Sequence, residues 1–80
     1  MKIVSSRRFE ELLSKLDNAW KSRVIKLVEK IIQNPEIGKP MRFARQGTRE
    51  IYLKPFRLSY SYSSSEQAIY LLDLYHKDEQ

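Results

Sequence analysis

The sequence predicts an α+β fold in which an N-terminal antiparallel helical hairpin packs on an antiparallel sheet of three to four strands. Two amphipathic helical patterns occupy the first half of the 80 residues, and three segments with strand-like patterns occupy the second half. A chain of this length only just supplies a single core. We therefore expect residues 1–80 to form one domain.

The first helix is expected over about residues 6–16. Ser6 is a suitable N-cap, and two glutamates fall in the early turns, where the helix dipole favours negative charge. Apolar residues then recur at the i, i+3, i+4 and i+7 positions of one helical face. Upstream of this helix, Ile3 and Val4 could form a brief edge strand.

The second helix is expected from about Ala19 to Gln33, where an apolar stripe faces away from most of the lysines. Asn34-Pro35 ends it, because the residue before a proline disfavours the helical conformation. Asp17-Asn18 supplies the turn between the two helices and the cap of the second one, so the helices form an antiparallel hairpin. Their apolar stripes must be covered, and the sheet is the large apolar partner that the chain offers.

Strands are expected at residues 49–54, 57–62 and 68–75, and residues 41–44 are a candidate for a first, irregular strand. Apolar and polar residues alternate in 49–54 and 57–62, so each of these strands is half buried. Pro55 predicts a tight turn between them, since proline restricts the residue before it and cannot donate to a ladder. The segment 68–75 is apolar at both parities, which is typical of a strand with neighbours on both sides.

Alternation also assigns side chains to the two faces of the sheet. Arg57 is expected on the face opposite Leu58 and Tyr60, because successive side chains of a strand point to opposite sides. Tyr60 and Tyr62 are expected to pack beneath the sheet. The face that carries Arg57 is then expected to be basic and aromatic.

Basic residues are concentrated in one part of the chain. The net charge is +5 and the isoelectric point is near 9.6. Residues 39–57 hold six basic side chains against Glu50 as a single acid. Such a surface suits contact with phosphate or with an acidic protein. A basic surface that simply faces solvent is equally compatible with the charge count.

Composition excludes several classes of protein. The chain has no cysteine and no metal-ligand spacing, so we expect neither disulfides nor a metal or cofactor. No apolar run approaches the length of a membrane span, and residues 1–6 lack the apolar core of a signal peptide. We expect a cytoplasmic protein with no membrane partner.

The order of these elements, together with two short motifs, resembles a known superfamily. The motifs are FRLSY at residues 56–60 and the closing segment LLDLYHKDEQ at residues 71–80. Over nearly the whole chain the arrangement is similar to the RelE/ParE superfamily of type II toxin–antitoxin toxins. The resemblance implies the RelE-like fold, a cognate antitoxin that binds and silences the protein, and contact with operator DNA through the antitoxin complex.

The superfamily contains two activities. RelE-like members are endoribonucleases that act in the ribosome and cut mRNA, which inhibits translation. ParE-like members poison DNA gyrase and are not nucleases. We favour a ribosome-dependent mRNA endoribonuclease, with the ribosome and mRNA as partners. The alternatives are a gyrase-inhibiting toxin and an inactive relative that only binds antitoxin or nucleic acid.

Metal-independent cleavage has the 2′-OH attack the adjacent phosphodiester, which requires a proton acceptor, cationic groups and a proton donor. The resemblance assigns Arg57 to the scissile phosphate, and its planar guanidinium suits phosphate oxygens. It assigns acid or base chemistry to His76, a residue type that exchanges protons near neutral pH, and phosphate binding to Lys77. YoeB-like relatives have a glutamate base where this chain has Met41. Glu50 is the nearest substitute, unless it pairs with a neighbouring arginine.

The remaining candidate residues would hold the RNA. Basic side chains contact phosphates, and aromatic faces beside them stack on unpaired bases. The predicted RNA-binding residues are Arg42, Arg45, Arg49, Tyr52, Lys54 and Tyr75.

Overall fold

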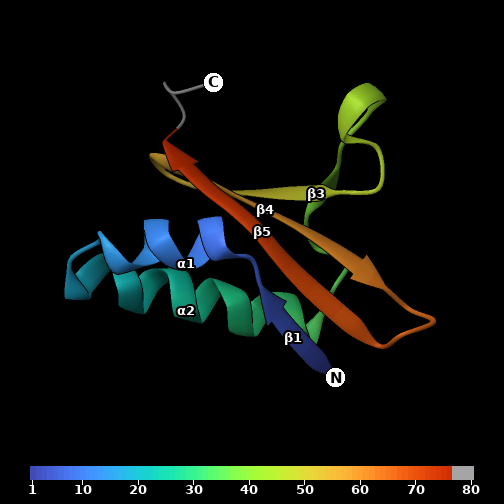
Figure 1. The fold of residues 1–80 in the computed structure, drawn as a ribbon, viewed down its shortest axis with the longest axis horizontal. Coiled ribbons are helices and arrows are strands. Elements are labelled where there is room, and N and C mark those ends of the chain that lie inside the picture. The colour runs from blue at the N-terminus through green and yellow to red at the C-terminus, as the bar shows by residue number, and fades with distance from the viewer. Residues whose placement is uncertain (77–80) are drawn as a thin grey trace.

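The computed structural model describes residues 1–76, which form an α+β fold of two α-helices, one 3-10 helix and five strands (Figure 1). The helical hairpin and the three longer strands lie where the sequence predicted them. Within residues 1–76, neither helix is both long and apolar enough to cross a membrane. In chain order the elements are β1 (Lys2–Ser5), α1 (Arg7–Ser14), α2 (Asn18–Gln33), β2 (Lys39–Pro40), η1 (Phe43–Arg45), β3 (Arg49–Leu53), β4 (Phe56–Ser63) and β5 (Ala68–His76).

The sheet is mixed, with the strand order β1-β5-β4-β3-β2. Strands β2 to β5 pair in antiparallel fashion, whereas β1 runs parallel to β5 with Ile3 opposite Ile69. The prediction of three to four strands, all antiparallel, was therefore wrong in the number of strands and in their direction. The brief edge strand suggested at Ile3 and Val4 is confirmed as β1, but its parallel pairing with β5 was not predicted. Parallel partners are joined by a long crossover instead of a turn, so no local sequence signal marks their pairing.

Both helices begin at the residues predicted to cap them. The Ser6 hydroxyl oxygen accepts a hydrogen bond from the backbone N–H of Phe9 at 2.9 Å, and the Asp17 carboxylate accepts one from the N–H of Trp20 at 2.9 Å. Ser6 also donates its hydroxyl proton to the carbonyl of Leu72, 2.6 Å away. The N-cap of α1 thus ties the helix to β5 as well as starting it.

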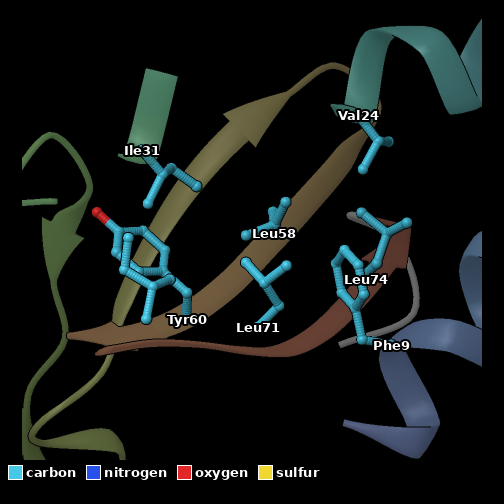
Figure 2. Packing of buried hydrophobic residues seen from close by; sticks show 8 residues of the cluster. Phe9, Val24, Ile31, Leu58, Tyr60, Leu71 and Leu74 are labelled. Atoms are coloured by element: carbon cyan, nitrogen blue, oxygen red, sulfur yellow. The ribbon is translucent and has the colours of Figure 1, made fainter. Parts of the chain in front are cut away.

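The core lies between the helical hairpin and one face of the sheet (Figure 2). Tyr60 is fully buried there, as predicted, and Tyr62 packs against the edge of the same cluster. The Tyr60 hydroxyl donates to the carbonyl of Pro35 at 2.7 Å and accepts from the N–H of Gly38 at 2.9 Å, so its burial leaves no polar atom unpaired. The fully or nearly fully buried apolar residues of the cluster are Phe9, Val24, Ile31, Leu58, Tyr60, Ile69, Leu71 and Leu74.

A β-bulge interrupts the pairing of β4 with β5. Ser59 lies opposite Asp73 and Tyr60 lies opposite Leu71, so Leu72 has no partner on β4. The extra residue lets Leu71 and Leu74 both face the core, although they differ in parity. This explains the apolar pattern of residues 68–75. The prediction that this strand has neighbours on both sides is confirmed, because β5 lies between β1 and β4.

The prediction of a strand at residues 41–44 was wrong. The strand is shorter and lies earlier, at β2, where Lys39 pairs with Glu50 of β3. The chain then leaves the sheet and forms η1. Phe43 has a φ of 59°, in the left-handed region, which is incompatible with an extended strand.

Candidate functional site

The face of the sheet opposite the helices carries a row of three predicted site residues. Tyr52 of β3 lies opposite Arg57 of β4, which in turn lies opposite Tyr75 of β5. Their neighbours Leu58 and Leu74 point into the core. Arg57 therefore lies on the face that alternation predicted, between two tyrosines.

Glu50 of β3 lies on the same face of the sheet, opposite Ser59 of β4, and is only 6% exposed. One of its carboxylate oxygens, Oε2, accepts hydrogen bonds from Arg45 Nη1 at 2.7 Å and from the Tyr75 hydroxyl at 2.8 Å. The other, Oε1, lies 3.5 Å from Arg57 Nη1. Two guanidiniums thus share a single carboxylate, which compensates the burial of Glu50 and leaves the cluster with a net positive charge.

The protonation of Tyr75 and Arg45 follows from these contacts. Burial raises the pKa of Tyr75, and its hydrogen bond to the Glu50 carboxylate raises it further. The pKa of Arg45 is raised mainly by its hydrogen bond to Tyr75 and also by the charge of Glu50. At neutral pH the site therefore holds a protonated tyrosine hydroxyl beside a permanent cation.

The Arg57 guanidinium is held by Glu50 through Nη1, and some of its other N–H donors have no acceptor among residues 1–76. Its Nε is buried and has no acceptor among residues 1–76. Its guanidinium carbon lies 5.8 Å from the centre of the Tyr52 ring, within the range of a cation–π contact. Because the Arg57 side chain is 35% exposed, the accessible part of its guanidinium can still bind an anion such as a phosphate group.

Two hollows adjoin this cluster on the surface. One has a volume of about 280 Å³ and is lined by Lys39, Met41, Glu50, Ile51, Tyr52 and Arg57. The other, of about 640 Å³, is lined by Lys39, Pro40, Met41, Arg42 and Phe43. They share Lys39 and Met41, so the two hollows lie side by side.

Other predicted RNA-binding residues lie away from Arg57. Arg49 donates from Nη1 to the carbonyls of Glu36 and Gly38, at 3.0 and 2.8 Å, and so fastens the loop after α2 to β3. Lys54 belongs to the turn between β3 and β4. Arg42 lies on the second hollow, just before η1.

The structure does not bring His76 to the Arg57 cluster. The His76 ring meets the ring of Phe56 edge to face, with centroids 5.7 Å apart, and Phe56 meets Trp20 of α2 in the same way at 5.1 Å. His76 therefore lies on the face that the helices cover. Lys77, the other predicted C-terminal site residue, lies outside the described residues.

Sequence reasoning missed Lys39, Met41 and Phe43, which line the hollows. Their signal was the mixture of basic and apolar residues from 39 to 45. Residues 41–44 were interpreted as a strand, and of this stretch Arg42 and Arg45 alone were predicted to bind RNA. Residues 1–76 contain no group of three or more acidic or histidine side chains arranged to bind a metal ion.

Solved structures of two toxin–antitoxin complexes resemble this fold. The intact RelBE complex of Escherichia coli contains a chain that matches with a TM-score of 0.78 and 15% identity, over 91% of this chain and 92% of that one. The RelBE2 complex of Mycobacterium tuberculosis matches with a TM-score of 0.85 and 21% identity, over 94% and 95% of the two chains.

A third solved structure matches to a similar degree. The YoeB/ParE toxin of Agrobacterium tumefaciens gives a TM-score of 0.83 and 18% identity, over 95% of this chain and 98% of that one. At such low identity these likenesses establish the fold alone, that of a RelE-like protein. No curated protein sequence matches the chain.

The family follows from a different comparison. Residues 3–80 match the family model described as "ParE toxin of type II toxin-antitoxin system, parDE". The chain therefore belongs to this family, within the RelE/ParE superfamily, and is the toxin component of a type II toxin–antitoxin system.

Proposed function

We propose that this toxin inhibits translation by cutting mRNA in the ribosome without a metal ion. One observation carries the proposal. Arg57, whose side chain is 35% exposed, stands between Tyr52 and Tyr75 on the face that the helices leave uncovered. A cation flanked by aromatic rings suits a phosphate with unpaired bases on either side.

The proposed reaction breaks one bond and forms one. The 2′-oxygen of a nucleotide attacks the adjacent phosphorus while the bond to the 5′-oxygen of the next nucleotide breaks, which yields a cyclic phosphate and a free 5′-hydroxyl. Arg57 binds the non-bridging phosphate oxygens, on which negative charge grows in the transition state.

Two side chains of the cluster can move the protons. Tyr75 is protonated at neutral pH and donates to the departing 5′-oxygen, after which the Arg45 cation stabilises the tyrosinate. Glu50 Oε1 lies beside Arg57 and accepts no hydrogen bond from residues 1–76. It is the acceptor that the cluster offers for the proton of the 2′-OH, and because it is buried, the bound RNA must displace part of its cover to reach it.

A cell-free translation reaction with a 5′-labelled mRNA tests the proposal. We expect cleavage by the wild type when ribosomes are present, none in their absence, and none by Arg57→Ala. Arg7→Ala is the matched control, since it removes an equal charge from an exposed position on α1. Full activity in a folded Arg57→Ala variant, or an intact message with the wild type, would refute the assignment.

We also propose a cognate antitoxin as partner. The RelE-like structures from E. coli and M. tuberculosis are toxin–antitoxin complexes. The basic segment 39–57 suits an acidic region of such a partner. The complex would then contact operator DNA. The proposed activity requires the cytoplasm, where ribosomes and mRNA are.

Inhibition of DNA gyrase is the second candidate function. The matching family model is that of ParE toxins, and His76 lies on the opposite face from Arg57. A gyrase supercoiling assay separates the two candidates. A ribonuclease leaves supercoiling unchanged, whereas a gyrase inhibitor abolishes supercoiling and leaves the translated message whole.

A further inference from the structure

Phe43 is exposed to an unusual degree for a large apolar side chain. Its exposed fraction is 90%, the highest among the exposed large apolar residues of the described chain. It lies on η1, on the rim of the larger hollow. A full aromatic ring in water is unfavourable for the isolated protein, and exposed apolar groups of this kind commonly mark interaction sites.

The backbone presents this ring on a closed loop. Phe43 has a φ of 59°, a conformation that is uncommon for a residue with a side chain. The loop is held shut at its base by a hydrogen bond from the N–H of Met41 to the carbonyl of Thr48, at 3.0 Å. The Gln46 N–H donates to the Phe43 carbonyl at 3.0 Å. Uncommon backbone conformations that are held in this way cluster at binding sites.

Basic residues lie close to Phe43 in the sequence, and two of them, Lys39 and Arg42, line the same hollow. Lys39, Arg42 and Arg45 lie within six residues of one another, and no acid occurs between Glu36 and Glu50. The hollow beside Phe43 shares Lys39 and Met41 with the hollow at Arg57. The hollow at Phe43 therefore lies next to the hollow at Arg57, within reach of the neighbouring nucleotide of a bound strand.

We propose that Phe43 is a stacking platform for a base of single-stranded RNA, next to the nucleotides held at Arg57. The proposal rests on the proposed function and extends it by a second contact. An aromatic ring near basic side chains matches the alternation of bases and phosphates in an RNA strand. A protein helix would instead need several apolar anchors at helical spacing, and this loop offers Met41 and Phe43 alone.

Fluorescence anisotropy with a labelled single-stranded RNA, blocked against cleavage by 2′-O-methyl groups, tests the platform. Phe43→Ala should weaken binding roughly 5- to 150-fold, the range for loss of one stacked base. Phe43→Tyr keeps the ring and should bind like the wild type. Phe43→Leu is apolar without a ring and should bind like Phe43→Ala. Ile25→Ala, at an exposed position on α2, is the control for loss of apolar surface.

Salt dependence gives a second readout. Because stacking involves no phosphate, Phe43→Ala should lower the affinity while the slope of log Kd against log salt stays unchanged. The platform is refuted if the wild type binds no RNA. It is also refuted if either Phe43→Ala or Phe43→Leu binds RNA as tightly as the wild type. A variant that loses antitoxin binding and keeps its RNA affinity would identify Phe43 as a protein contact and also refute it.

Different experimental results would refute the stacking platform and the proposed nuclease function. Phe43-dependent RNA binding by a wild type that never cuts the translated message would refute the nuclease and support the platform. Cleavage by Phe43→Ala with wild-type RNA affinity would support the nuclease and refute the platform.

Discussion

Arg57 and His76 lie on opposite faces of the sheet, although hydrogen-bonded neighbouring strands carry them. Arg57 pairs with Tyr75 across β4 and β5, whereas His76 pairs with Phe56 and contacts its ring on the helix side. Tyr75, one residue before the histidine, is therefore the side chain of β5 that reaches the Arg57 cluster. Its hydroxyl is bonded to Glu50, 2.8 Å away.

We predict that His76→Ala cuts translated mRNA at close to the wild-type rate. The imidazole contacts Phe56, so its loss should instead lower the free energy of unfolding by about 0.5–1.5 kcal/mol, the range for an aromatic pair. Urea denaturation and the cell-free assay measure the two effects. Loss of cleavage in a variant of unchanged stability would show that His76 takes part in the reaction.

Tyr75→Phe, in contrast, should lower the rate of cleavage. It removes a single hydroxyl from the proposed proton donor, and loss of a general acid typically costs about 10²- to 10⁴-fold in rate. Single-turnover cleavage in programmed ribosomes measures this loss. Tyr70→Phe is the matched control, because it removes a hydroxyl that bonds to Glu66 near the other end of β5. Equal cleavage rates for Tyr75→Phe and Tyr70→Phe would show that Tyr75 takes no part in proton transfer.

Glu50→Ala should destabilise the fold. Without the carboxylate, the guanidiniums of Arg45 and Arg57 face each other uncompensated, and the Tyr75 hydroxyl loses its acceptor. Because both arginines remain partly exposed, we expect a loss of about 1–3 kcal/mol. The midpoint of urea unfolding measures it. Glu29→Ala, at an exposed position on α2, is the control, and equal midpoints for the two variants would contradict the expectation.

Tyr60 should make stability depend on alkaline pH. Burial raises the pKa of Tyr60, and the N–H of Gly38 and the charge of Arg49 oppose this only in part. A pKa that is higher in the folded state means that the unfolded chain loses its proton first. The free energy of unfolding should therefore fall as pH rises above about 10, the pKa of an unperturbed tyrosine.

The variant Tyr60→Phe checks this pH dependence. At neutral pH it should lose about 1–3 kcal/mol, because the carbonyl of Pro35 and the N–H of Gly38 lose their partner. Its alkaline decline should be shallower than that of the wild type. Tyr62→Phe, on the same strand, is the control. An alkaline decline that is identical in the wild type and Tyr60→Phe would assign the effect to other groups.

Local patterns were sufficient to predict most of the fold. Ser6 and Asp17 mark the helix starts through hydrogen bonds to the residue three positions on, and Pro55 marks the turn between β3 and β4. These signals act over a few residues and can be read directly. The pairing of Ile3 with Ile69 could not be predicted, since it depends on where the helical hairpin returns the chain.

The candidate site could be predicted only in part. Alternation placed Arg57 on its observed face, but the bulge at Leu72 exchanges the faces of all later residues of β5. Counted from Leu71 without the bulge, Tyr75 would face the core and His76 would face Arg57. A bulge depends on tertiary pairing with β4 and has no clear signature in the residues themselves.

The pairing of β1 with β5 also has a consequence for how the protein is made. Lys2 lies opposite Ala68, and the Ser6 hydroxyl bonds to Leu72. During synthesis the first strand must wait for the last one to leave the ribosome before it can pair. Contacts between such distant segments form slowly. The newly made toxin therefore has an incomplete sheet until β5 has emerged from the ribosome.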